Sequence, residues 1–131
     1  MIYFISGHRD LNKEDFEKHY VPMINAVLED KSGRLNVFVI GDCDGVDKMA
    51  QDYLSKTLPR NLHILVTVYH PGNKPRYLAS PCFLTSGGYK DDVEKDEAMT
   101  RESQVDLAII GKGRWTSGTA QNILRRYEQE L

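Results

Sequence analysis

The sequence predicts an α/β fold: a Rossmann-like three-layer domain with a mostly parallel sheet of four to five strands flanked by helices. Three observations predict it. Short runs made only of apolar residues alternate with longer segments whose apolar residues recur at helical spacing. Strands that are apolar throughout are typical of parallel sheets covered on both faces. The 131 residues are enough for one hydrophobic core, so we expect a single domain over residues 1–131.

In the first half of the chain, the pattern of apolar residues predicts three strands joined by two helices. The strands are the apolar or β-branched runs at residues 2–5, 37–40 and 62–69. The first helix starts at Asn12, an N-cap residue, and extends to Leu28, with a kink at Pro22. The second helix follows a glycine turn, covers residues 46–58 and ends before Pro59.

The next part of the chain predicts a long loop, a helix and a strand. Residues 70–90 contain prolines and glycines without a sustained period, which predicts a long loop. Loops of this length often serve as lids or binding loops, and disorder is the alternative. Residues 91–103 predict a polar helix in which Val93 and Met99 are buried. Residues 105–110 predict the fourth strand, which leads into a second glycine turn.

A final helix ends the chain. Its inner face should carry Ala120, Ile123, Leu124, Tyr127 and Leu131. Arg125 and Arg126 lie in its C-terminal half, where a cation favours the helix dipole. Both arginines meet this criterion equally.

Composition limits the classes of partner. The net charge of -2 gives no electrostatic signal for duplex nucleic acid, so we expect a small-molecule partner. No apolar run is long enough for a membrane helix and no signal-peptide pattern follows Met1, so we expect a cytoplasmic protein without a membrane partner. Cys43 and Cys82 form no metal-binding set, and we expect both thiols to be reduced.

Polar turns follow three predicted strands and should meet at the carboxyl edge of the sheet. The first turn is formed by Ser6, Gly7, His8 and Arg9. Its first two residues allow a ligand to approach the backbone closely, His8 supplies a titratable ring, and Arg9 supplies a cation that can pair with phosphate or carboxylate. The turn at 111–119 is the predicted phosphate site, because it offers hydroxyls and free amides at the start of a helix. Its candidate residues are Trp115, Thr116, Ser117, Gly118 and Thr119. Trp115 either stacks on a base or packs against a helix, and a hydroxyl of this turn can serve simply as an N-cap.

The turn at 41–47 has a different chemistry. It contains Gly41, Asp42, Asp44, Gly45 and Asp47. Its carboxylates repel phosphate but suit ribose hydroxyls, a base edge or a divalent cation that bridges to phosphate. Alternatively, some of them only complement the dipole of the following helix. On the helix at 91–103, Lys95 and Glu97 are candidates to face the same site, and a solvated charged face is the alternative.

Several segments, taken in order, resemble the SLOG superfamily, and most of all its YspA-like branch (domain of unknown function 2493). They are Gly7-His8-Arg9-Asp10, residues 41–50, Met99 ahead of residues 105–109, and Ser117-Gly118-Thr119. This superfamily is a Rossmann-like group that includes the Lonely Guy phosphoribohydrolases and the core of DNA-processing protein A. The resemblance implies a nucleotide or nucleotide-derived ligand, with phosphate at 111–119 and ribose or base near 41–47. It also implies homo-oligomers by analogy.

Three functions remain open at this point. The first is a nucleotide-binding domain that acts as a sensor. The second is an N-glycosidase or phosphoribohydrolase, or a deoxyribosyltransferase, that acts on a nucleoside monophosphate with Asp47 or Glu97 as its catalytic carboxylate. The chain departs from the enzymatic branch, because Ala120-Gln121-Asn122 follows the glycine turn where that branch has a glutamate, and Lys95 replaces an arginine. The third is an interaction module in DNA processing or phage defence.

Overall fold

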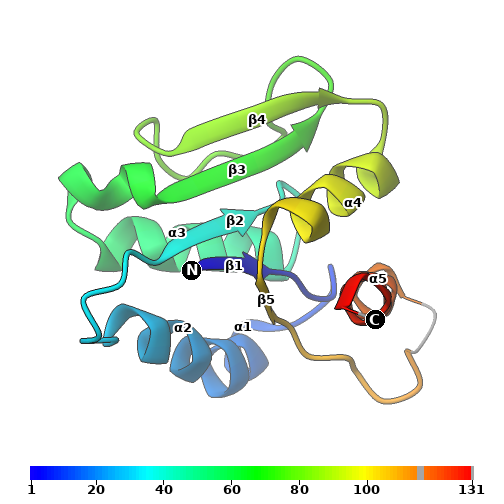
Figure 1. Ribbon diagram of the computed structural model, residues 1–131, viewed down its shortest axis with the longest axis horizontal. Helices are drawn as coiled ribbons and strands as arrows, with labels where there is room; N and C mark the ends of the chain where they lie inside the picture. Colours follow the sequence, from blue (N-terminus) through cyan, green and yellow to red (C-terminus); the bar gives the residue numbers. More distant parts are fainter. Residues whose placement is uncertain (115–116, 131) are drawn as a thin grey trace.

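Figure 1 shows the computed structural model, which describes residues 1–114 and 117–130. Five strands form one sheet, namely β1 (Ile2–Ile5), β2 (Val37–Ile40), β3 (Val66–Pro71), β4 (Leu84–Tyr89) and β5 (Val105–Leu107). All neighbouring strands are parallel, and their order is β4-β3-β2-β1-β5. The predicted α/β class with a parallel sheet is therefore confirmed. The order also shows that the winding of the chain reverses at β1, which lies between β2 and β5.

Helices cover both faces of the sheet, which gives three layers (Figure 1). One face is covered by α1 (Lys13–Asp15), the π-helical turn η1 (Phe16–Tyr20), α2 (Val21–Leu28) and α3 (Val46–Thr57). The other face is covered by α4 (Asp92–Glu102), against which α5 (Gly118–Glu130) packs. Asn12 caps α1 as predicted, since its Oδ1 accepts from the amide of Asp15 at 2.8 Å. Pro22 lies just after η1, so the helix changes geometry where the kink is predicted.

The prediction for residues 62–69 is wrong at its start. Residues Arg60–Leu65 form the 3₁₀ helix η2, and β3 begins only at Val66. His63 holds this turn in place, because its buried ring contacts Ser80 Oγ at 2.6 Å and the carbonyl of Leu58 at 3.0 Å. Ser80 is 17 positions away from His63, so the local apolar pattern did not indicate this contact.

The predicted loop at 70–90 contains the edge strand β4. This strand is exposed along most of its length, so it shows no alternation of apolar and polar residues. Gly87 is required there, since a Cβ at this position would lie 2.1 Å from Cε1 of the His70 ring. The glycine that makes the segment look like a loop is therefore in contact with the buried His70 ring, next to the irregularity between β3 and β4.

Two predictions about helix faces are also wrong. Val93 is 55% exposed, whereas Met99 is buried as predicted. In α5 the side chains of Leu124 and Tyr127 are exposed, and the buried face carries Thr119, Ala120, Asn122 and Arg126. Leu131 lies outside the described residues. None of the described helices is both long and apolar enough to cross a membrane.

Candidate functional site

A cavity of about 320 Å³ opens at the carboxyl end of β1, where the winding of the sheet reverses. We call it the crevice; its walls come from the turn after β1, the turn before α3, α4, and the start of α5. The predicted site residues that line it are Ser6, Gly7, His8, Arg9, Asp47, Lys95, Ser117, Gly118 and Thr119. Trp115 and Thr116 lie outside the described residues. The structure thus brings together residues from all three predicted turns.

The turn after β1 supplies the floor of the crevice. Ser6 is 5% exposed, and its Oγ has no hydrogen-bond partner among the described residues. His8 Nε2 accepts from the amide of Gly111 at 2.7 Å, which ties the first turn to the segment before α5. Burial, together with the charge of Arg114, lowers the pKa of His8, so the ring is a neutral acceptor at neutral pH. His8 therefore positions the walls of the crevice relative to each other.

The N-terminus of α5 forms the opposite wall. Ser117 Oγ accepts from the amide of Ala120 at 3.2 Å, so this hydroxyl caps the helix. A Cβ at Gly118 would meet no atom of the described residues within 4 Å. The positive end of the helix dipole thus borders the cavity at Gly118, beside the capping hydroxyl of Ser117. Arg114, which also lines the crevice, forms a paired contact with Asp10 at 2.6 Å for both nitrogen–oxygen distances.

The other predicted glycines serve packing within the protein. A Cβ on Gly7 would lie 2.4 Å from Val46 Cγ2, and one on Gly41 would lie 2.5 Å from Asp47 Oδ2. Gly45 has φ +75°, and a Cβ there would lie 2.4 Å from the carbonyl oxygen of His8. These positions admit only glycine because protein atoms occupy the space. The structure gives no direct ligand-facing role to Gly41 or Gly45, which do not line the crevice.

Asp47 and Lys95 lie side by side in the inner wall of the crevice. Asp47 Oδ2 accepts from the amide of Cys43 at 3.1 Å. Burial raises the pKa of Asp47 to about 7, although the charge of Lys95 opposes the rise. Burial also disfavours the charge on Lys95, but the carboxylates of Asp47 and Asp96 outweigh it and raise the pKa of the ammonium group. Lys95 therefore faces the crevice as predicted, and the alternative of a solvated face does not hold for it, since it is 1% exposed.

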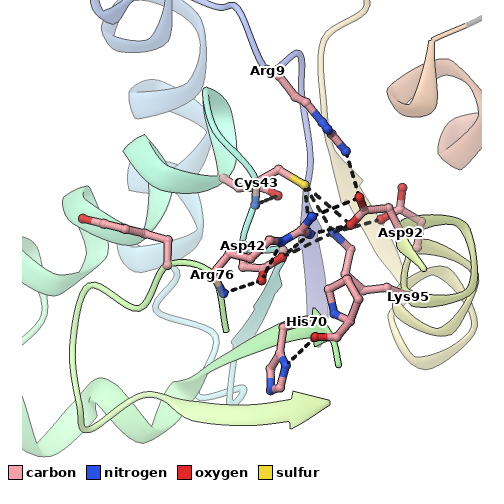
Figure 2. Close-up of polar contacts among 12 residues, drawn as sticks. Arg9, Asp42, Cys43, His70, Arg76, Asp92 and Lys95 are labelled. Carbon is pink, nitrogen blue, oxygen red and sulfur yellow. Dashed lines mark hydrogen bonds and ion pairs between the residues drawn. The ribbon is translucent and has the colours of Figure 1, made fainter. Parts of the chain in front are cut away.

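Figure 2 shows Lys95 within a network that sequence reasoning missed. Its Nζ lies 3.0 Å from Asp92 Oδ1 and 3.8 Å from Asp42 Oδ1. Arg76 closes the network: Asp42 accepts from its backbone amide at 2.8 Å and from Nη2 at 2.6 Å. Hydrogen bonds from Arg76 hold the pKa of Asp92 far below its ordinary value. Arg76 comes from the aperiodic stretch of the chain, so no sequence signal paired it with Asp42.

Asp42 and Asp44 do not reach the crevice. They line a second cavity of about 240 Å³, which shares Arg9 and Cys43 with the crevice. The predicted lid also borders this second cavity, through Arg76 and Tyr77, and contributes no residue to the lining of the crevice. The residues predicted for one site are thus divided between two adjacent cavities.

A divalent cation near the 41–47 turn was one alternative from the sequence. Asp42, Cys43 and Asp92 bring three candidate ligand atoms within 4.8 Å of one another. However, Arg76 Nη2 lies 2.6 Å from Asp42 Oδ1 and 2.5 Å from Asp92 Oδ1. A metal ion bound by both carboxylates would have to displace this guanidinium group, so we assign no metal to the cluster.

Glu97 lies outside the crevice. Its side chain is exposed and borders a separate surface depression beside Lys90 and Glu94. Its neighbour Asp96 lines the crevice instead, and burial raises the pKa of that carboxyl. One position along α4 turns the side chain by about 100°, so spacing within a polar helix does not distinguish the two residues.

The fold and the crevice together define the class of protein: a Rossmann-like α/β domain with a polar cavity at the switch point of its sheet. Comparison with protein-family models, curated proteins and solved structures gave no match for this chain. The residues of the crevice are therefore the basis for the function proposed below.

Proposed function

We propose that this domain binds a nucleotide or nucleotide-derived small molecule in the crevice and acts as a sensor of it. One observation carries the proposal. The N-terminus of α5 at Gly118 lines the same cavity as the buried hydroxyl of Ser6, which has no hydrogen-bond partner within residues 1–114 and 117–130, and this cavity lies at the switch point of a parallel sheet. Helix N-termini at this place in α/β sheets bind phosphate groups. The cavity volume of about 320 Å³ lies in the range of small-molecule sites.

The crevice has two ends with different chemistry, which supports a nucleotide rather than a simple anion. At one end, the α5 dipole and the guanidinium group of Arg114 favour phosphate. At the other end, Asp47 and Asp96 offer carboxyl oxygens that suit the hydroxyls of a sugar. Membership of the SLOG superfamily, together with a cytoplasmic location, is part of the same proposal, and the order of the turns along the chain supports it.

A negative charge at Gly118 should prevent ligand binding without unfolding the domain. In wild type, a nucleotide at about 100 times its Kd should add about 2.7 kcal/mol to stability, seen as a rise in Tm. In Gly118→Asp this rise should be lost for AMP, ADP-ribose and NAD, because a carboxylate then stands where phosphate binds. The position is open and its φ is not positive, so an added side chain fits.

Gln129→Asp is the matched control, since it adds the same charge to the exposed far end of α5. The control should retain the ligand-induced rise in Tm, whatever its effect on the Tm of the free protein. If no nucleotide in the panel shifts the Tm of wild type, or if Gly118→Asp binds as well as Gln129→Asp, the proposal is wrong.

The raised pKa of Asp47 favours a second candidate, an N-glycosidase that acts on the bound nucleotide. With a pKa of about 7, this carboxyl can both give and take a proton at neutral pH. Release of free base from a nucleoside monophosphate should then be detectable by chromatography and fall about 100-fold or more in Asp47→Asn. Glu97→Gln is the control and should keep full activity, because Glu97 lies outside the crevice. Binding without base release in wild type would leave the sensor as the function.

A further inference from the structure

The second cavity lies next to the crevice and has its own recognition chemistry. Arg9 and Cys43 line both cavities, so a ligand that passes these two side chains occupies both. Arg9 pairs with Asp92 at 3.0 Å, yet its side chain is 63% exposed. Its guanidinium group is thus fixed between the two cavities by Asp92, while part of the side chain faces solvent.

Cationic and aromatic groups line the second cavity. Lys48 and the partly exposed Arg9 supply positive charge, whereas the charge of Arg76 is taken up by Asp42 and Asp92. Asp42 also lines it, but its buried carboxylate is satisfied by Arg76, so it does not repel an incoming anion as a free carboxylate would. Lys48 makes no ion pair within the described residues, and its Nζ lies 4.9 Å from the centre of the Tyr77 ring. Asp44 is the one exposed carboxylate of the lining in the described part of the chain.

From this juxtaposition we infer that the ligand carries a second phosphate group, attached on the far side of its sugar, and that this phosphate occupies the second cavity. The inference rests on the proposed function, which puts the first phosphate at α5 and the sugar near Asp47. Arg9 and Cys43 join the crevice to the second cavity, which Lys48 lines. A nucleoside bisphosphate satisfies this arrangement, and so does a dinucleotide whose second nucleoside lies on the Tyr77 ring.

Three probes test the inference by calorimetry: AMP, adenosine 3′,5′-bisphosphate and the linear dinucleotide pApA. Wild type should bind at least one of the two longer probes about ten-fold more tightly than AMP, because an added phosphate gains charge-assisted contacts. The preference should decrease as salt is raised, since the cations of the second cavity are partly exposed.

Variants locate the second phosphate. Lys48→Ala should reduce the preference for the longer probe to about two-fold or less. Lys56→Ala is the matched control, because Lys56 is an exposed lysine of the same helix that lines neither cavity. Tyr77→Ala distinguishes the two ligand types: it should reduce the preference for pApA over the bisphosphate only if a second nucleoside lies on the ring.

The outcomes separate this inference from the proposed function. If AMP and both longer probes bind with equal Kd, or if the preference survives in Lys48→Ala, the second cavity does not hold a phosphate and the inference is overturned while nucleotide binding stands. If none of the three probes binds wild type although ADP-ribose or NAD does, the inference alone is overturned. If ADP-ribose and NAD also fail to bind, the proposed function is wrong and the inference is wrong with it.

Discussion

Replacing Lys95 with methionine is expected to lower the free energy of unfolding by about 3–5 kcal/mol at neutral pH. Lys95 is 1% exposed and lies 3.0 Å from Asp92 and 3.7 Å from Asp96. Methionine fills much the same volume but brings no charge, so the buried carboxylates around it lose their compensation. Asp47 is affected most, because among the charges that lower its pKa that of Lys95 comes first.

The loss should depend on pH, with a sign that follows from Asp47. Burial raises the pKa of this carboxyl to about 7 in the folded state, against an ordinary value of 3.8. Removing Lys95 raises the pKa further, so the folded variant binds the proton more tightly than the unfolded chain does. Wild type stops losing stability through this group once pH passes about 7, whereas the variant continues to lose stability up to its higher folded pKa. The stability difference from wild type should therefore grow as pH rises above about 7, and the part that comes from Asp47 should be constant between about 4 and 7.

Urea denaturation at several pH values measures both effects. Lys90→Met is the matched control, because Lys90 is an exposed lysine just before α4 and its replacement should change stability by about 0.5 kcal/mol or less. A Lys95→Met protein as stable as Lys90→Met would contradict the proposed role of the ammonium group. A loss that does not change with pH would assign the effect to packing alone.

Replacing Arg126 with methionine is the second large effect, again about 3–5 kcal/mol. The guanidinium group is 7% exposed and contacts Asp106 through Nε at 3.3 Å and Nη2 at 3.1 Å. It also donates to the carbonyl oxygen of Ser103 at 2.6 Å and to that of Thr100 at 3.2 Å. Methionine leaves these buried acceptors without a donor, which costs more free energy than removing both partners of a polar contact would.

The adjacent Arg125 provides the control for Arg126. It is half-buried and makes one side-chain hydrogen bond, to Asn122 Oδ1 at 2.7 Å, so Arg125→Met should lose about 0.5–1.5 kcal/mol. Chemical denaturation of the two variants checks the contrast. Equal losses would mean that Arg126 does not anchor α5. Since the N-terminus of α5 lines the crevice, a loss of the contacts that anchor α5 in Arg126→Met should also weaken nucleotide binding.

Local pattern was sufficient for much of the fold. The runs at β1 and β2 contain only apolar or aromatic side chains because both faces of these strands are covered, and α3 shows its buried face at helical spacing. The local sequence pattern did not predict elements whose conformation depends on residues far away in the sequence. Strand β4 is an exposed edge with two glycines, and η2 depends on the contact between His63 and Ser80.

The candidate site shows the same division. The convergence of the turns after β1 and β5 followed from the sequence, because parallel strands deliver their carboxyl ends to one edge. The partners of the charged residues did not follow. Arg76 reaches Asp42 from 34 positions away, and nothing local distinguishes the buried Lys95 and the half-buried Asp96 from the exposed Glu97 on the same helix.

The sequence by itself determined the α/β class, the parallel sheet and the edge at which the polar turns meet, since these depend on whether each short segment is apolar, helical or polar. Only the tertiary structure decided which charges are buried, which glycines leave room for protein atoms and which face of α5 points inward. The physical reason is that a buried charge is stable only when opposite charges and hydrogen-bond donors surround it. Those partners come from segments far apart along the chain, and folding alone brings them together.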